Sequence, residues 1–235
     1  MPAPAMADMV LLDVGGLLLL PDHGAIRRAV ESTGAHTEQD GLDRAHYLAL
    51  AEVECLPEPP PGFARGPFWV AYARAAGVEP DLVAAAAAAI ERVQRRSPLY
   101  TRVIPGCRRG LRAVAATGVR ISLVTNTEHG HVEAILRGLG VCQVGPGAGV
   151  RLEALVDSHV VGVAKPDPRI FQLALERSPA RAEATIHVGD SLRADVEGAR
   201  AAGIRPVHFD PLRLCRAADH AHVGGLLELA TLLRS

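Results

Sequence analysis

Short apolar runs that end in a polar residue or a glycine recur along the chain. They cover residues 9–13, 120–125, 152–157, 184–189 and 205–209. Most are rich in leucine or β-branched residues, which is typical of strands that are buried on both faces of a sheet. The pattern therefore predicts a buried strand at each of these positions.

Apolar residues at helical spacing fill the segments between these runs. The clearest segments are residues 107–116, 131–139, 168–176 and 193–202, and Gly203 is a suitable stop for the last of them. An alternation of strands and helices predicts an α/β fold, a parallel sheet with helices on both faces. Ligands bind such sheets beyond the carboxyl ends of the strands. We therefore expect one edge of the sheet to gather the polar residues that end the strands, Asp13, Thr125, Asp157 and Asp190.

Residues 23–97 follow a different pattern. They contain no convincing strand and offer helical pieces at residues 24–32, 38–55, 66–76 and 81–96, with a proline-rich break at 56–62. The pattern predicts an all-α domain of residues 23–97, inserted into a core of residues 1–22 and 98–235. Its aromatic residues at helical spacing, Phe68, Trp69 and Tyr72, are expected to pack in the core of that insert rather than to line a substrate site.

Composition limits the classes of partner. The net charge is −1, so the chain has no excess of positive charge for binding nucleic acid or an anionic membrane. No apolar segment reaches the ~20 residues that a membrane span needs. Residues 1–8 lack the basic region of a signal peptide. We therefore expect a cytoplasmic protein.

Cysteine and histidine usage predicts no structural metal. The four cysteines lie far apart without a C-x-x-C pair, so we expect reduced thiols rather than a disulfide framework or a zinc site. Among the ten histidines no pair has zinc spacing together with a third ligand, which favours surface or capping roles.

Four short motifs occur in a fixed order along the predicted strand ends. They are the segments LDVGGL (12–17), LVTN (123–126), AKPDP (164–168) and VGDSLRAD (188–195). In this order the motifs resemble those of the haloacid dehalogenase superfamily, and the resemblance covers residues 8–22 and 98–212. It implies a Rossmann-like core, a helical cap inserted between motifs one and two, and hydrolysis that begins with attack by an aspartate.

The chemistry of the motif residues supports these roles. Asp13 ends a buried strand, where its carboxylate can attack phosphorus and form an aspartyl phosphate. Lys165 would neutralise charge on the transferring group and hold the nucleophile ionised. Thr125 offers a hydroxyl donor to a phosphate oxygen. Asn126 is a second candidate for substrate binding, and it can also shape the adjoining turn.

Asp190 is the candidate ligand for Mg²⁺, which prefers a few carboxylates together with water and substrate oxygens. The resemblance implies that Asp13 and the main-chain carbonyl of Gly15 are the other protein ligands. Asp195 would orient Lys165 or a metal-bound water, or simply cap the following helix. Ser191 is expected either to cap that helix or to contact the site.

The chain departs from the family pattern at Gly15. Phosphatases of this superfamily usually carry there a second aspartate, which protonates the leaving group and then activates water. General acid–base catalysis contributes about 10²–10⁴ in rate, so phosphatase turnover should be slow or limited to good leaving groups. The nearest replacements, Asp22 and His23, are more typical of ordinary turn residues. The threonine often found in motif one is replaced by Leu17.

Three other functions stay open. A carbon–halogen hydrolase of the 2-haloacid dehalogenase type also lacks the second aspartate and needs no metal, but Asp190 and Asp195 favour a metal-dependent reaction. A weakened enzyme would bind a phosphorylated ligand without turnover. Phosphoryl transfer within a sugar depends on the missing acid–base group. We therefore predict a Mg²⁺-dependent phosphatase of a small phosphorylated metabolite, with its substrate and oligomeric state undetermined.

Overall fold

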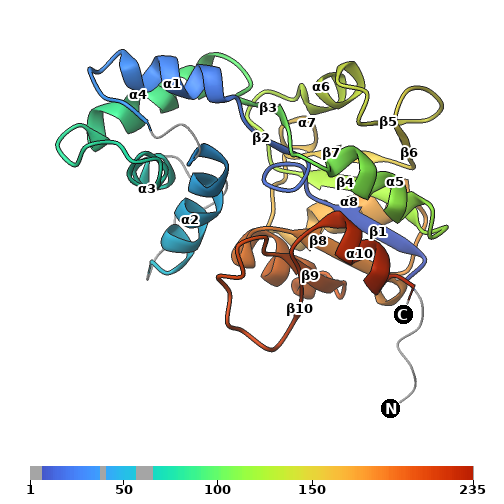
Figure 1. The fold of residues 1–235 in the computed structure, drawn as a ribbon. Helices are drawn as coiled ribbons and strands as arrows, with labels where there is room; N and C mark the ends of the chain where they lie inside the picture. Colours follow the sequence, from blue (N-terminus) through green and yellow to red (C-terminus); the bar gives the residue numbers. More distant parts are fainter. Residues whose placement is uncertain (1–6, 38–40, 57–65, 235) are drawn as a thin grey trace. The chain divides into compact units, whose positions relative to one another are not determined.

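The computed structural model describes residues 7–37, 41–56 and 66–234 (Figure 1). The chain divides into two compact units, a core unit of Met1–Leu18 and Ile104–Ser235 and a helical unit of Leu19–Val103. These boundaries lie a few residues outside the limits of 23 and 97 that the sequence predicts for the insert. The reason is that β2 (Leu19–Pro21) pairs antiparallel with β3 (Tyr100–Val103), so both strands belong to the helical unit.

A six-stranded parallel sheet with the order β10-β9-β8-β1-β4-β7 forms the centre of the core unit. Its strands are β1 (Met9–Leu12), β4 (Arg120–Thr125), β7 (Leu155–Asp157), β8 (Thr185–Gly189), β9 (Arg205–Phe209) and β10 (Ala221–Val223). All four residues of β1 are fully buried, as expected for a central strand. The predicted α/β, Rossmann-like core is therefore confirmed.

Helices cover both faces of this sheet. They are α5 (Cys107–Ala115), α6 (Val132–Gly138), α7 (Ser158–Val161), α8 (Pro168–Arg177), α9 (Gly198–Ala201) and α10 (Leu226–Leu232), with the short helices η1 (Ala182–Ala184) and η2 (Leu192–Glu197). α5 and α10 pack closely on the face nearer the viewer in Figure 1, where a Cβ on Gly110 would lie 2.5 Å from that of Leu226. On the other face Met9 and Leu11 pack with Phe171 of α8.

The helical unit consists of four helices: α1 (His23–Glu31), α2 (Leu42–Glu54), α3 (Pro67–Ala75) and α4 (Val83–Arg96). Phe68, Trp69 and Tyr72 of α3 are fully buried and contact one another, so they form the core of this unit as the sequence predicts. Asp22 accepts a hydrogen bond from the main-chain N–H of Ala25 and caps α1. Most of the predicted proline-rich break lies outside the described residues.

Two elements differ from the sequence prediction. The single strand expected at residues 152–157 is two strands, because β6 (Val150–Leu152) pairs with β5 (Cys142–Val144) whereas β7 pairs with β4. Between them the main-chain N–H of Ala154 donates to the Ser122 hydroxyl, which breaks the strand. The helix expected from residue 193 begins with η2, a π-helical turn in which the N–H of Val196 donates to the carbonyl of Ser191.

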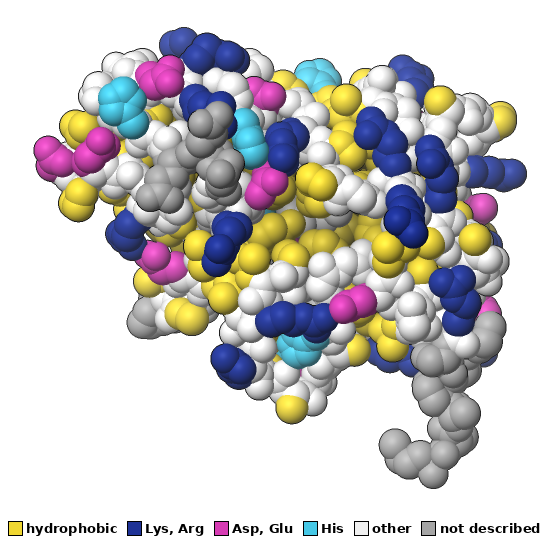
Figure 2. Space-filling view, viewed as in Figure 1, with side chains coloured by type: hydrophobic (Ala, Val, Ile, Leu, Met, Phe, Trp, Pro, Cys, Tyr) yellow, Lys and Arg dark blue, Asp and Glu magenta, His cyan; other side chains and the backbone are white. Residues whose placement is uncertain are grey.

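The surface agrees with the low net charge. On the face shown in Figure 2, arginine side chains are distributed over both units rather than gathered on one of them. Among the helices that the structure describes, none is long and apolar enough to cross a membrane.

Candidate active site

The carboxyl ends of three neighbouring strands bring the motif residues together. Asp13 directly follows β1, and its main-chain N–H donates to the carbonyl of Val188 in β8 (2.9 Å). Asp190 directly follows β8, and Thr125 is the last residue of β4. Because β1 lies between β4 and β8, these three residues lie at one edge of the sheet, as the strand pattern predicts.

Three buried carboxylates and one buried ammonium group form the centre of this site. Carboxylate oxygens of Asp13, Asp190 and Asp195 lie within 4.8 Å of one another. Nζ of Lys165 lies 2.8 Å from Oδ1 of Asp13 and 2.6 Å from Oδ1 of Asp195. Lys165 is only 2% exposed, so its ion pairs are shielded from water. We call these four residues the acidic cluster.

Asp195 fixes the position of Lys165. Its Oδ1 accepts hydrogen bonds from Lys165 and from Nε2 of His187 (2.8 Å), and its Oδ2 accepts from the main-chain N–H of Ser191 (3.0 Å). A Cβ on Gly189 would lie 2.1 Å from Cγ of Asp195, so only glycine lets this carboxylate lie over the strand end. The structure thus gives Asp195 the orienting contact that was one of the predicted alternatives.

His187 is a site residue that the sequence analysis missed. It is fully buried on β8, and its ring packs edge-on against Phe171. Its position two residues before Gly189 places it on the same face of the strand, because side chains alternate along a strand. That alternation is the sequence feature that identifies it as a neighbour of the site.

Asn126 holds the main chain of Lys165. Its Nδ2 donates to the Lys165 carbonyl (3.0 Å), and its Oδ1 accepts from the Lys165 N–H (2.9 Å). Ser191 caps η2 by accepting from the N–H of Ala194 (3.0 Å). Gly15 lies two residues beyond Asp13 and is half-buried. Contacts of Thr125 and Asn126 with substrate, and of Gly15 with a metal, stay predictions.

Burial and charge set the protonation of the cluster. Burial raises the pKa of Asp13 to about 7, although the positive charge of Lys165 opposes this shift. Burial by itself would lower the pKa of Lys165, but Asp13 and Asp195 raise it above its usual value. The pKa of Asp195 is held below its usual range, because Lys165 and His187 outweigh the opposing effect of burial. Lys165 alone therefore does not keep Asp13 fully ionised at neutral pH.

The donor set fits a divalent cation. Three carboxylates share one ammonium group, so the ionised cluster carries an excess of buried negative charge. Hard cations such as Mg²⁺ prefer oxygen ligands, and a cation beside Asp13 would favour its ionised form. Asp13 and Asp190 would hold such an ion from adjacent strands.

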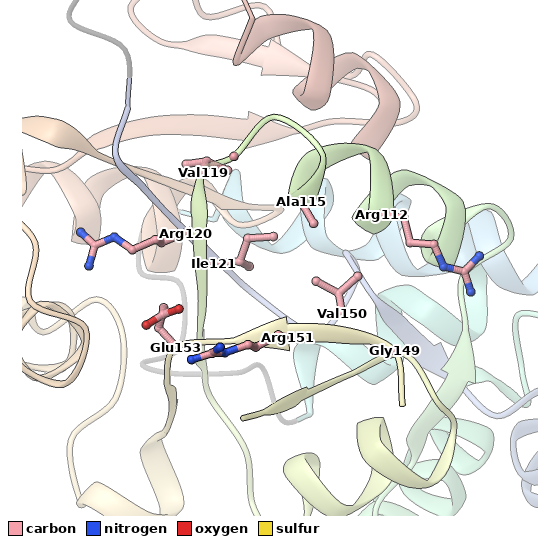
Figure 3. Close-up of a pocket in the computed structure, with 10 residues that line it drawn as sticks. Arg112, Ala115, Val119, Arg120, Ile121, Gly149, Val150, Arg151 and Glu153 are labelled. Carbon is pink, nitrogen blue, oxygen red and sulfur yellow. The ribbon is translucent and has the colours of Figure 1, made fainter. Parts of the chain in front are cut away.

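A cavity elsewhere in the core unit does not share these features. It is an open pocket of about 500 Å³, lined by Arg112, Arg120, Arg151 and Glu153, among others. It lies at the start of β4, whereas Thr125 ends that strand, so it is at the opposite edge of the sheet. Figure 3 shows the side chains of Arg112 and Arg120 pointing away from each other rather than toward one anion.

Comparison with known proteins agrees with this geometry. A model of the haloacid dehalogenase-like hydrolase family matches residues 7–203. The chain belongs to this family. It is 33% identical over 108 residues to haloacid dehalogenase-like hydrolase domain-containing protein 3 of Mus musculus, which is 46% of this chain and 40% of that protein. It is 35% identical over 135 residues to a phosphoserine phosphatase of Thermus thermophilus, which is 57% of this chain and 50% of that protein. The chain thus spans about half or less of these curated relatives.

Solved structures of haloacid dehalogenase-like proteins share the fold over nearly the whole chain. A proposed hydrolase of this family, YfnB from Bacillus subtilis, described as bound to magnesium, gives a TM-score of 0.62 at 20% identity and covers 97% of this chain and 99% of its own. A 2-haloacid dehalogenase from Pseudomonas syringae gives a TM-score of 0.56 at 21% identity and covers 97% of this chain and 99% of its own. At these identities the likeness concerns the fold alone.

Proposed function

We propose that this family member is a Mg²⁺-dependent phosphatase that acts on a small phosphorylated metabolite through an aspartyl phosphate on Asp13. One observation carries the proposal: Asp13 contacts Lys165 and lies beside Asp190, all three buried at the carboxyl edge of the sheet. Phosphatases among the relatives, including the Thermus phosphoserine phosphatase, support the reaction class without identifying the substrate.

The reaction begins with Asp13. Lys165 holds Oδ1 of Asp13, so the other carboxylate oxygen is the one that attacks phosphorus. The new bond joins that oxygen to phosphorus, and the bond between phosphorus and the leaving oxygen breaks. Lys165 neutralises negative charge on the transferring group, and Asp195 keeps the ammonium group in place. Mg²⁺, when bound by Asp13 and Asp190, would supply further positive charge at the phosphoryl oxygens.

Water then attacks the phosphorus of the aspartyl phosphate, which releases inorganic phosphate and regenerates the Asp13 carboxylate. Both steps move a proton, first to the leaving oxygen and later from the water. At the position where related phosphatases use an aspartate, this chain has Gly15, which has no side chain to carry a proton. We therefore propose that substrates with good leaving groups react fastest.

The helical unit is proposed to act as the cap that governs substrate choice. Its four helices form their own buried core, as an independently packed cap requires. Its aromatic residues on α3 are used in that core, so specificity is proposed to come from other residues of the unit. A cap would also exclude water from the reacting phosphoryl group.

One screen tests the reaction class. Phosphorylated metabolites and 2-haloacids are incubated with wild type, Asp13→Asn and the surface control Asp81→Asn, each with and without EDTA. We expect phosphate release that EDTA and Asp13→Asn abolish and that Asp81→Asn retains. Halide release that survives EDTA would instead assign the dehalogenase reaction. Binding of Mg²⁺ and phosphate without release of either product would assign a ligand-binding protein.

Gly15→Asp tests the missing acid–base group. We expect a larger kcat with poor leaving groups and little change with p-nitrophenyl phosphate, because a good leaving group needs no proton. No change with either substrate would show that another residue already transfers this proton.

A further inference from the structure

A second polar cluster lies between β9 and β10, outside the four motifs. His208 on β9 and His222 on β10 face each other in register across these paired strands. The loop between the strands contributes Cys215 and His220. One side-chain nitrogen from each histidine and Sγ of Cys215 all lie within 4.8 Å of one another. We call these four residues the His/Cys cluster.

The hydrogen bonds of His208 leave one nitrogen unused. His208 is 6% exposed, and its Nε2 donates to the main-chain carbonyl of Asp190 (3.0 Å). A carbonyl only accepts, so Nε2 carries the proton and Nδ1 of the neutral ring holds a lone pair. Among the residues that the structure describes, this Nδ1 has no hydrogen-bond partner, and the same is true of the buried Nε2 of His222. A buried ring nitrogen without a partner is unfavourable, so both nitrogens would gain by binding a ligand.

His220 is oriented in the way that metal-binding histidines usually are. Its Nδ1 lies 2.7 Å from Oδ1 of Asp219, and its side chain is only 3% exposed. Asp219 is in turn held by Arg200 (2.7 Å). Donation from Nδ1 to a carboxylate fixes the tautomer and leaves Nε2 to bind a metal. Nε2 of His220 lies 3.9 Å from Sγ of Cys215, close to the separation of about 3.5 Å between sulfur and nitrogen ligands of a tetrahedral zinc ion.

The loop that carries Cys215 is held in place. Both oxygens of the buried Asp210 carboxylate accept main-chain N–H groups, from Leu214 (3.0 Å) and from Cys215 (2.8 Å). The N–H of Asp210 donates to the carbonyl of Val223 in β10 (2.9 Å). The thiol is therefore presented to the three histidines by a loop that is tied to both strands, rather than by a chance approach.

We propose that His208, Cys215, His220 and His222 form a tetrahedral zinc site that joins β9, β10 and the loop between them. Three imidazole nitrogens and one thiolate suit Zn²⁺, whereas Mg²⁺ prefers oxygen. Binding takes the proton from the Cys215 thiol and leaves the three rings neutral. Because four protein atoms complete the coordination, the site has no open position and acts as a structural one.

Cobalt substitution tests this site without knowledge of the enzyme's substrate. The full chain, purified without a histidine tag and freed of metal, is titrated with Co²⁺. We expect a near-ultraviolet band from thiolate-to-cobalt charge transfer that saturates at about one ion per chain, and Zn²⁺ should bleach it. Absence of the band at saturating Co²⁺ would overturn the proposal, because Co²⁺ held by the acidic cluster has only oxygen ligands.

Variants assign the ligands. Cys215→Ser should lose the band, whereas Cys55→Ser, which removes an exposed free thiol, and Asp190→Asn should keep it. Asp219→Asn should keep the band and weaken Co²⁺ binding about ten- to a hundredfold, because Asp219 supports a ligand without being one. A band that persists in Cys215→Ser would overturn the assignment. If Cys215→Ser does not fold, an unchanged Co²⁺ affinity in Asp219→Asn would overturn the assignment instead.

Discussion

The acidic cluster and the His/Cys cluster are joined by one hydrogen bond and differ in chemistry. The Asp190 carboxylate belongs to the acidic cluster, while its main-chain carbonyl accepts a hydrogen bond from His208 of the other. The first gathers charged oxygen donors around a buried lysine, and the second gathers neutral nitrogen donors and a thiol. One edge of a single parallel sheet thus presents oxygen donors beside nitrogen and sulfur donors, and we propose that the two sets hold metals of different softness.

The two clusters are also assembled differently. Asp13 and Asp190 come from distant segments and meet because they follow adjacent strands of the sheet. Lys165 reaches them from the loop before α8, where Asn126 holds its main chain. The His/Cys cluster comes from one short segment, residues 208–222, whose ends are paired strands. The acidic cluster should therefore govern chemistry, and the His/Cys cluster should govern the local stability of β9 and β10.

The largest expected difference lies in catalysis. Asp13→Asn should lower phosphate release about 10⁴-fold or more, because it removes the nucleophile, and it should leave the Co²⁺ charge-transfer band unchanged. Cys215→Ser should do the reverse, losing the band while phosphate release falls less than about tenfold. Steady-state kinetics and a Co²⁺ titration on both variants measure this. Loss of both properties in either variant would show that the clusters form a single site.

Lys165 belongs to the acidic cluster alone, and its removal tests how much the buried charges of that cluster affect the free energy of unfolding. Lys165→Gln should lower the free energy of unfolding by about 3–5 kcal/mol at pH 8, because it leaves buried carboxylates without a counter-charge. The loss should be smaller at pH 5, where those carboxyls can protonate. Urea unfolding measures both values. The control Arg181→Gln, which breaks an exposed ion pair with Glu183, should change stability little at either pH. Equal losses for the two variants would contradict a charge-based role for the acidic cluster.

Gly189 tests how closely Asp195 approaches the strand end. Gly189→Ala should destabilise the protein by about 1–3 kcal/mol, because the added Cβ would overlap Asp195, and it should also displace Lys165. In the control Gly138→Ala the added Cβ meets no atom within 4 Å in a helix, so stability should stay equal or rise slightly. Thermal unfolding compares the two. If Gly189→Ala unfolded at the same temperature as wild type, Asp195 would have room to move away from the added Cβ.

The smallest expected effect is a pH dependence of Mg²⁺ binding. Burial raises the pKa of Asp13 to about 7, so the metal-free protein has this carboxyl protonated at lower pH. The protonated Asp13 carboxyl stabilises the folded state, because the pKa of an aspartate in the unfolded chain is only about 4. This stabilisation is fully present below about pH 4 and is lost as the pH rises through about 7. On our proposal Mg²⁺ binds the ionised form, so it would have to displace the proton below pH 7.

Calorimetry at several pH values checks this. Mg²⁺ affinity should fall about tenfold for each pH unit below 7 and should level off above it. Asp81→Asn, a surface change, should show the same profile. A constant affinity between pH 5.5 and pH 8 would mean that Asp13 is ionised without the metal or does not bind it.

Sequence reasoning recovered the core fold and the acidic cluster because both follow from local patterns. Asp13 and Asp190 each follow a buried run, and that placement alone brings them to one edge. A further feature of the sequence marks Lys165 as a candidate site residue. It is the only lysine in a chain whose other permanently positive side chains are all arginines. A compact point charge at that position is consistent with contacts to two carboxylates.

The His/Cys cluster could not be predicted in the same way. Zinc spacing rules describe ligands that lie close together on short loops, whereas His208 and His222 become neighbours only through the pairing of β9 with β10. β10 is short and partly exposed, so its apolar pattern was too weak to indicate a strand. The split of residues 152–157 depends on the Ser122 hydroxyl of another strand, which no local pattern contains.

The single lysine provides the most direct test of the central claim, that Asp13, Lys165 and Asp190 form one site for a metal and a phosphoryl group. Protein labelled with ¹³C only in lysine gives one set of side-chain NMR signals, those of Lys165. We expect these signals to shift when Mg²⁺ is added and again when inorganic phosphate follows, and Asp190→Asn should abolish the Mg²⁺ shift. Signals that do not move with saturating Mg²⁺ and phosphate, or that move equally in Asp190→Asn, would contradict the account.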